Sequence, residues 1–127
     1  MRIKSVSRHL KSLCRRLGPD YRIKMIDLEY VIHRDFGNGY DIEVSGVNTS
    51  KAGATATIYL WKDENRIVKK VTDVPQQDIG IWAEWLRGKA EHFAPADFGK
   101  DGYLKNEART VSARECPVTP YPQRTVI

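Results

Sequence analysis

The 127-residue chain is long enough for one domain with its own hydrophobic core and too short for two, and its 41% hydrophobic and 29% charged residues are typical of soluble globular proteins. Two cysteines, a basic start with no following apolar region, and no apolar window of about 20 residues argue against a disulfide framework, a zinc site, a signal peptide and a membrane span, so we expect a cytoplasmic protein. The net charge of +5 is concentrated in residues 1–24, which hold eight basic residues and one acidic residue.

An amphipathic helix is predicted near the N-terminus. Apolar residues from Ile3 to Leu17 fall within an arc of about 100° on a helical wheel, and Gly18 followed by Pro19 marks the end of the helix. Basic residues at helical spacing lie roughly opposite this arc, namely Lys4, Arg8, Lys11 and Arg15. The helix therefore presents a basic stripe to solvent or to a partner.

Alternation of apolar and polar residues predicts the strands that follow. Within residues 21–33 the alternation changes phase once, at residues 25–26, which we interpret as a β-bulge inside one strand. Asn38 and Gly39 predict a tight turn. The expected four-stranded antiparallel meander consists of residues 21–33, 40–45, 55–62 and 66–74.

Pro75 is predicted to begin a second helix, with an apolar face from Ile79 to Phe93. Farther along, prolines and polar turns separate short apolar pieces, so we expect one α+β domain over residues 1–94 and a loosely ordered or extended tail over residues 95–127. Helices at both ends of a meander pack most simply on one face of the sheet, which gives a two-layer sandwich. The other face is then open to water or to a partner.

Catalytic motifs are weak in this sequence. The stretch "HRDFG" at residues 33–37 contains two triplets of the protein-kinase active site, but a kinase needs two separate aspartates and a glycine-rich loop, so we interpret Asp35 as a turn residue. No histidine has metal-ligand partners at a suitable spacing, and Asp41 and Glu43 are expected on the wet face of the sheet. We therefore expect no enzyme, metal or cofactor. An enzyme remains an alternative, with a site assembled from His33, Asp35, Asp41 and Glu43.

Two surfaces are candidates for binding. The first is basic, and it suits nucleic acid because lysines and arginines along a helix face contact phosphates and release counterions. Its residues are Lys4, Arg8, Lys11, Arg15, Arg16, Arg22 and Lys24. The second is aromatic, and its residues either pack in the core or anchor a protein interface. The candidate partner-binding residues are Tyr59, Trp61 and Trp85.

The order helix, strands, helix is similar to that of the double-stranded RNA-binding domain, which has three strands and a lysine cluster where this chain has residues 76–78, "QQD". We transfer no residue role from that family. Our first hypothesis is a small non-catalytic binding protein that presents its basic helix to nucleic acid or to a nucleic-acid complex such as a ribonucleoprotein. The alternative is an inhibitor or adaptor that contacts a protein, of the compact kind that phages and mobile elements encode, including anti-CRISPR proteins.

Overall fold

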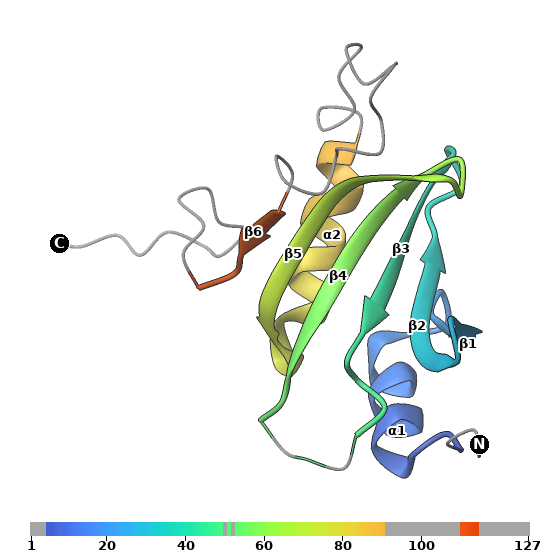
Figure 1. The fold of residues 1–127 in the computed structure, drawn as a ribbon, viewed down its shortest axis with the longest axis vertical. Coiled ribbons are helices and arrows are strands. Elements are labelled where there is room, and N and C mark those ends of the chain that lie inside the picture. Colours follow the sequence, from blue (N-terminus) through green and yellow to red (C-terminus); the bar gives the residue numbers. More distant parts are fainter. Residues whose placement is uncertain (1–4, 50, 52, 91–109, 115–127) are drawn as a thin grey trace, which may run out of the picture.

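The computed structural model describes residues 5–49, 51, 53–90 and 110–114 (Figure 1). Its elements are α1 (Arg8–Leu17), β1 (Arg22–Ile26), β2 (Glu29–Asp35), β3 (Tyr40–Ser45), β4 (Thr55–Lys62), β5 (Arg66–Pro75), the 3-10 turn η1 (Gln76–Asp78), α2 (Ile79–Lys89) and β6 (Thr110–Ser112). The strands form one sheet in the order β1-β2-β3-β4-β5-β6, in which β1 to β5 are antiparallel neighbours and β6 runs parallel to β5. The α+β arrangement is confirmed, but the antiparallel part has five strands instead of the four expected.

The extra strand arises because residues 21–33 form a hairpin. Ile26 pairs with Glu29, so Asp27 and Leu28 form a two-residue turn between β1 and β2. Both turn residues have positive φ, 52° and 64°, as a type I′ turn requires. A two-residue turn changes which residues face the core in the same way as a bulge does, so the phase change at residues 25–26 was real and the bulge was the wrong interpretation.

Both helices begin later than predicted. The Ser7 hydroxyl accepts a hydrogen bond from the Leu10 N–H at 3.0 Å, which caps α1 and starts it at Arg8 instead of near Ile3. Pro75 ends β5, and η1 leads from it into α2. The predicted helical residues before Ser5 and beyond Ala90 lie outside the described residues.

The turn between β2 and β3 lies where the sequence predicted it. Asp35 Oδ1 accepts a hydrogen bond from the Gly37 N–H at 2.8 Å, and Asn38 Oδ1 accepts one from the Tyr40 N–H at 3.2 Å. Gly37 and Gly39 have φ values of 84° and 89°, which glycine adopts without a steric penalty. Asp35 therefore acts in the turn, as we interpreted it.

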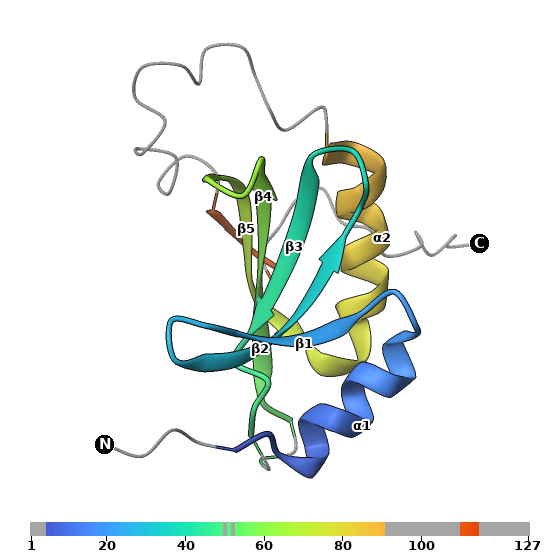
Figure 2. The same cartoon turned by 90° about the vertical axis from the view of Figure 1, so that its right-hand side faces the viewer.

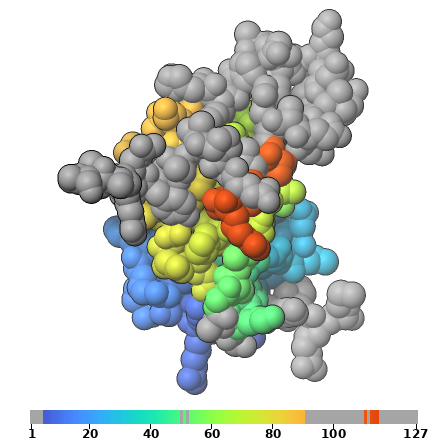
Figure 3. Space-filling view, turned by 90° about the vertical axis from the view of Figure 1, so that its left-hand side faces the viewer, coloured from blue at the N-terminus to red at the C-terminus, as the bar shows by residue number. Residues whose placement is uncertain are grey.

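Both helices cover the same face of the sheet (Figure 2). The core between the layers contains large side chains with no exposed surface, among them Leu10, Ile42, Ile58, Trp82 and Leu86. The two helices also lie side by side, with α1 in blue next to the yellow first turns of α2 (Figure 3). The two-layer prediction is thus correct in outline, and no helix of the described residues covers the other face of the sheet.

Residues 110–114 return to the sheet beside β5. Thr110–Ser112 form β6, and the Ser112 hydroxyl donates a hydrogen bond to Asp73 Oδ2 at 2.7 Å. The sequence analysis assigned no strand within residues 95–127, and the remainder of that region lies outside the described residues.

Candidate functional site

Helix α1 carries the first part of the predicted nucleic-acid surface. Arg8, Lys11 and Arg15 are exposed and follow one helix face at positions i, i+3 and i+7. Arg16 is also exposed, and it borders a hollow between α1 and α2. Lys4 lies outside the described residues. The helix therefore presents four described bases to solvent.

Strand β1 carries the other two predicted bases, Arg22 and Lys24, which pair with His33 and Val31 and so point to the side of the sheet away from the helices. It contacts α1, and both elements lie along the same flank of the molecule (Figure 2). Arg22 and Lys24 on β1 are exposed, and they line a hollow that also includes the carboxylates of Asp20 and Asp35. The flank is therefore uniformly basic on α1 and mixed in charge at the β1 end.

None of the described basic residues on this flank forms an ion pair with a described carboxylate. Arginines elsewhere do, since both Arg34 and Arg87 pair with Glu84. Phosphates can therefore approach this flank without first breaking an internal ion pair. We call the following residues the basic surface: Arg8, Lys11, Arg15, Arg16, Arg22 and Lys24.

The aromatic residues predicted to bind a partner lie in two places. Trp85 is half-buried on α2, where its ring packs edge-on against Trp82 at a centroid distance of 5.3 Å. Tyr59 and Trp61 are half-buried on β4 and face the side of the sheet that has no helix. The structure therefore does not bring Trp85 together with the other two.

Trp85 belongs to an open groove between α1 and α2. Its apolar lining includes Leu13, Leu17 and Ile81, and Ile81 is 42% exposed. Gln76 lines the same groove, and its Nε2 atom is buried without a hydrogen-bond partner among the described residues. We call this the interhelical groove; its volume is about 770 Å³.

The sheet face without a helix is not the wet surface that the sequence predicted. Asp41 and Glu43 on β3 are each only 9% exposed. The β1–β2 hairpin projects on this side, away from the helices (Figure 2). Together with the central strands it borders a hollow of about 220 Å³, which we call the far-face hollow. Its lining residues are Lys24, Ile26, His33, Asp41, Glu43, Trp61 and Glu64.

Four polar side chains of the far-face hollow are hydrogen-bonded in two pairs. His33 Nε2 and Asp41 Oδ2 lie 2.8 Å apart, and Trp61 Nε1 donates a hydrogen bond to Glu43 Oε1 at 3.1 Å. Burial raises the pKa of the Glu43 carboxyl, and the Trp61 hydrogen bond opposes that rise. Three residues of the enzyme alternative thus meet here. Asp35 ends β2 opposite Asp41 but does not line the hollow, and its carboxylate accepts a hydrogen bond from the turn. Across the described ranges no group of three His, Cys, Asp or Glu side chains is arranged to hold a metal ion.

This hollow was not predicted from the sequence, because residues 21–33 were interpreted as one bulged strand and they form the hairpin that borders it. With a single long strand, the acids of β3 alternate with buried residues and resemble an ordinary solvated face. The only available signal was that β4 carries bulky side chains on both faces, with Tyr59 and Trp61 on the side away from the helices.

Comparison with known proteins found no matching family model, no similar curated protein and no similar solved structure. No helix in the described part of the chain is long and apolar enough to cross a membrane.

Proposed function

We propose that this chain is a small, non-catalytic nucleic-acid-binding protein of the cytoplasm that holds the phosphate backbone with its basic surface. The observation that carries the proposal is the exposure of six arginines and lysines, none of them paired with a described carboxylate. Binding of phosphates by such residues is driven by the release of condensed counterions. Contacts to phosphates carry no sequence information, so we expect little sequence preference.

The placement of acidic residues favours contact through α1, because Lys24 of β1 also lines the acidic far-face hollow. Asp41, Glu43 and Glu64 line the far-face hollow, where they would repel phosphates. The aromatic residues Tyr59 and Trp61 lie on that acidic side, so they do not interleave with the bases of α1 as stacking residues do in single-strand binding grooves. Backbone contact that is centred on α1 is the mode that this distribution supports.

Binding to duplex and single-stranded DNA and RNA over a salt series tests the proposal. The variant Lys11→Gln/Arg15→Gln removes two charges from the basic surface, and Lys51→Gln/Lys89→Gln removes two exposed charges elsewhere as the matched control. The first variant should bind more weakly, and its slope of log K against log salt should be about 2 less negative than that of the wild type. The control should leave the affinity and the slope unchanged. Equal losses in both variants would contradict a localised surface.

A contact with a protein partner is the second candidate, and the interhelical groove favours it. Large apolar residues that remain exposed beside a tryptophan are typical of interface anchors, and here Ile81 lies beside Trp85. This candidate predicts that Trp85→Ala costs about 2 kcal/mol or more in affinity for the partner while circular dichroism shows an intact fold. Unfolding of that variant would instead assign Trp85 to the core.

A further inference from the structure

One side chain beside the far-face hollow is fully buried outside the main core. Val31 on β2 has no exposed surface, yet it is not part of the core cluster beneath the helices. It lies two residues before His33 on the same strand, so both side chains point to the face without helices. Figure 1 shows this face toward the viewer, with α2 behind β4 and β5. The β1–β2 hairpin therefore has a buried side chain of its own on this face, and its residues Lys24, Ile26 and His33 line the hollow beside it.

Glu43 is a nine-tenths buried carboxylate without a paired cation. Its Oε1 atom accepts a hydrogen bond from the neutral indole of Trp61. Its Oε2 atom has no hydrogen-bond donor among the described residues and is not one of the fully buried atoms that lack a partner, so it is open to solvent in the hollow. Asp27 and Glu29 place further negative charge near it, and His33 acts in the opposite direction. A buried carboxylate with a single neutral donor costs free energy, and a cation placed beside it lowers that cost.

The residues around Glu43 also supply groups that bind cations. Asp41 is equally buried and supplies a second carboxylate, which is bonded to His33 on one oxygen. Trp61 supplies an aromatic ring, and rings beside carboxylates are the usual partners of guanidinium and ammonium groups. The volume of about 220 Å³ is below the range of sites for drug-sized ligands, so it suits the charged end of a chain.

From these contacts we propose that the far-face hollow binds a guanidinium or ammonium group, held between the carboxylates of Glu43 and Asp41 beside the indole of Trp61. The group belongs either to a free small amine or to an arginine or lysine side chain of a peptide, and the two sources share this chemistry. The inference does not depend on the nucleic-acid proposal, because it uses ligands of the opposite charge and a different set of residues, of which only Lys24 is shared with the basic surface.

Lys24 provides the sharpest distinction between a cationic and an anionic ligand. It lines the far-face hollow, is exposed, and forms no ion pair with a described carboxylate. A bound cation is repelled by the Lys24 ammonium, whereas a bound anion is attracted by it. Lys24→Gln should therefore strengthen cation binding and weaken the nucleic-acid binding proposed above.

The test is a titration followed by the NMR signal of the Trp61 indole N–H, which is identified by its loss in Trp61→Phe. The probes are agmatine, the peptide Gly-Arg-Gly, and the same peptide with neutral citrulline in place of arginine. We expect saturable shifts with agmatine or with the arginine peptide and none with the citrulline peptide. Tighter binding of agmatine would identify a free amine as the ligand, and tighter binding of the peptide would identify a side chain.

Variants complete the test. Glu43→Gln keeps an oxygen for the Trp61 hydrogen bond and removes the charge, so it should weaken binding at least about tenfold while the fold persists. Asp20→Asn, an exposed acid outside the hollow, is the matched control and should have no effect. The proposal is overturned by an absence of saturable shifts up to about 10 mM probe. Unchanged affinity in a folded Glu43→Gln variant, or weaker binding in Lys24→Gln, would overturn it equally.

Discussion

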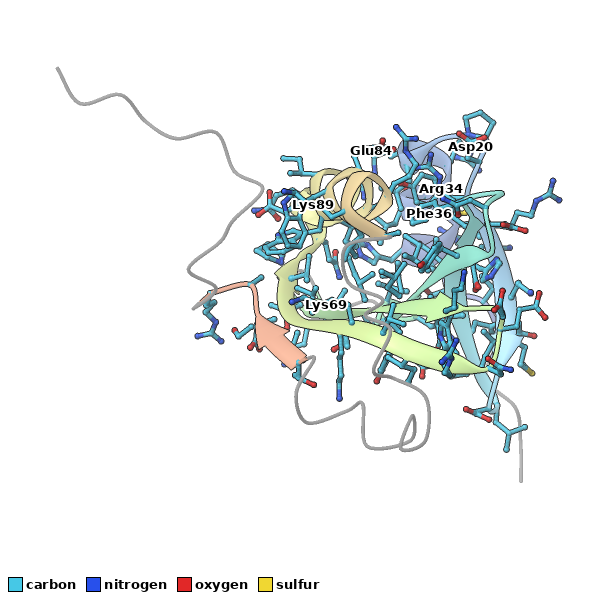
Figure 4. All side chains as sticks on the ribbon, turned by 90° about the horizontal axis from the view of Figure 1, so that it is seen from above. Asp20, Arg34, Phe36, Lys69, Glu84 and Lys89 are labelled. Carbon is cyan, nitrogen blue, oxygen red and sulfur yellow. The ribbon has the colours of Figure 1, made fainter. Side chains whose placement is uncertain are left out.

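Replacement of Arg34 by methionine should remove the hydrogen bonds and ring contacts by which this side chain links the sheet to α2. We call these contacts the Arg34 clamp. The Arg34 side chain is only 12% exposed, and its guanidinium donates hydrogen bonds to the Tyr21 hydroxyl, at 3.1 Å, and to Glu84 on α2. The guanidinium carbon also lies 5.2 Å from the ring centroids of both Tyr21 and Phe36. Figure 4 shows Arg34 grouped with Phe36 and Glu84 at one end of the molecule. Methionine keeps much of the volume and removes the charge and the hydrogen bonds.

The expected loss follows from these contacts. A hydrogen bond from a buried charged donor contributes about 1.5 kcal/mol, which applies to the bond with Tyr21. The Glu84 side chain is 51% exposed, so water replaces most of that interaction and we assign it about 0.5 kcal/mol. Each ring contact contributes about 0.5 kcal/mol. Arg34→Met should therefore lower the free energy of unfolding by about 2 to 3 kcal/mol.

Urea denaturation of the full chain at pH 7 measures this loss by linear extrapolation. The hydrogen bond from Arg34 holds the pKa of the Glu84 carboxyl below its ordinary value, so the pair stabilises the fold above that value and loses its effect as the pH falls through the folded pKa. The stability difference between wild type and Glu84→Gln should therefore shrink below about pH 4. A loss under about 0.5 kcal/mol in Arg34→Met, or a Glu84→Gln difference that grows on acidification, would refute the clamp.

Three further substitutions test the fold. Leu28→Gly should stabilise the protein by about 1 kcal/mol in thermal denaturation, because Leu28 is 70% exposed at a φ of 64°, whereas Leu28→Ala should not. Gly88→Ala should add about 0.5 to 1 kcal/mol of stability by the same measurement, because a Cβ there meets nothing within 4 Å and alanine favours the helix; a loss would show that α2 is strained at this point. Glu43→Gln should raise the free energy of unfolding at pH 7. Burial raises the folded pKa of Glu43, so the cost of ionising it appears only as the pH rises above the ordinary value, and urea denaturation should find the two proteins equally stable below about pH 4.

Most of the fold is readable from the sequence, because alternation over the central strands is strong. Residues 40–45 and 55–62 form β3 and β4 with the predicted bounds, and β5 extends only one residue beyond its prediction. The first hairpin was not readable, because Asp27 and Leu28 lack the Asn-Gly or Asp-Gly pattern that signals a type I′ turn. Leucine in a left-handed conformation is unfavourable in isolation, so only the pairing of β1 with β2 determines this turn.

The two candidate surfaces differ in how far sequence predicts them. Exposure of the α1 bases follows from helical spacing, since Arg8, Lys11 and Arg15 lie opposite the residues that contact the core. Burial of Asp41 and Glu43 depends on the projection of the β1–β2 hairpin over the sheet, which is a tertiary arrangement. Alternation along β3 identified their face correctly and gave no information on what covers it.

The salt dependence of nucleic-acid binding tests the central proposal most directly. Six phosphate contacts from the basic surface predict a slope of log K against log salt of about −5.5 on duplex DNA. The account predicts that slope for the wild type and a slope nearer −3.5 for Lys11→Gln/Arg15→Gln, with the Lys51→Gln/Lys89→Gln control unchanged. An absence of binding to DNA and RNA at low salt, or a slope that the Lys11→Gln/Arg15→Gln variant leaves unchanged, would contradict it.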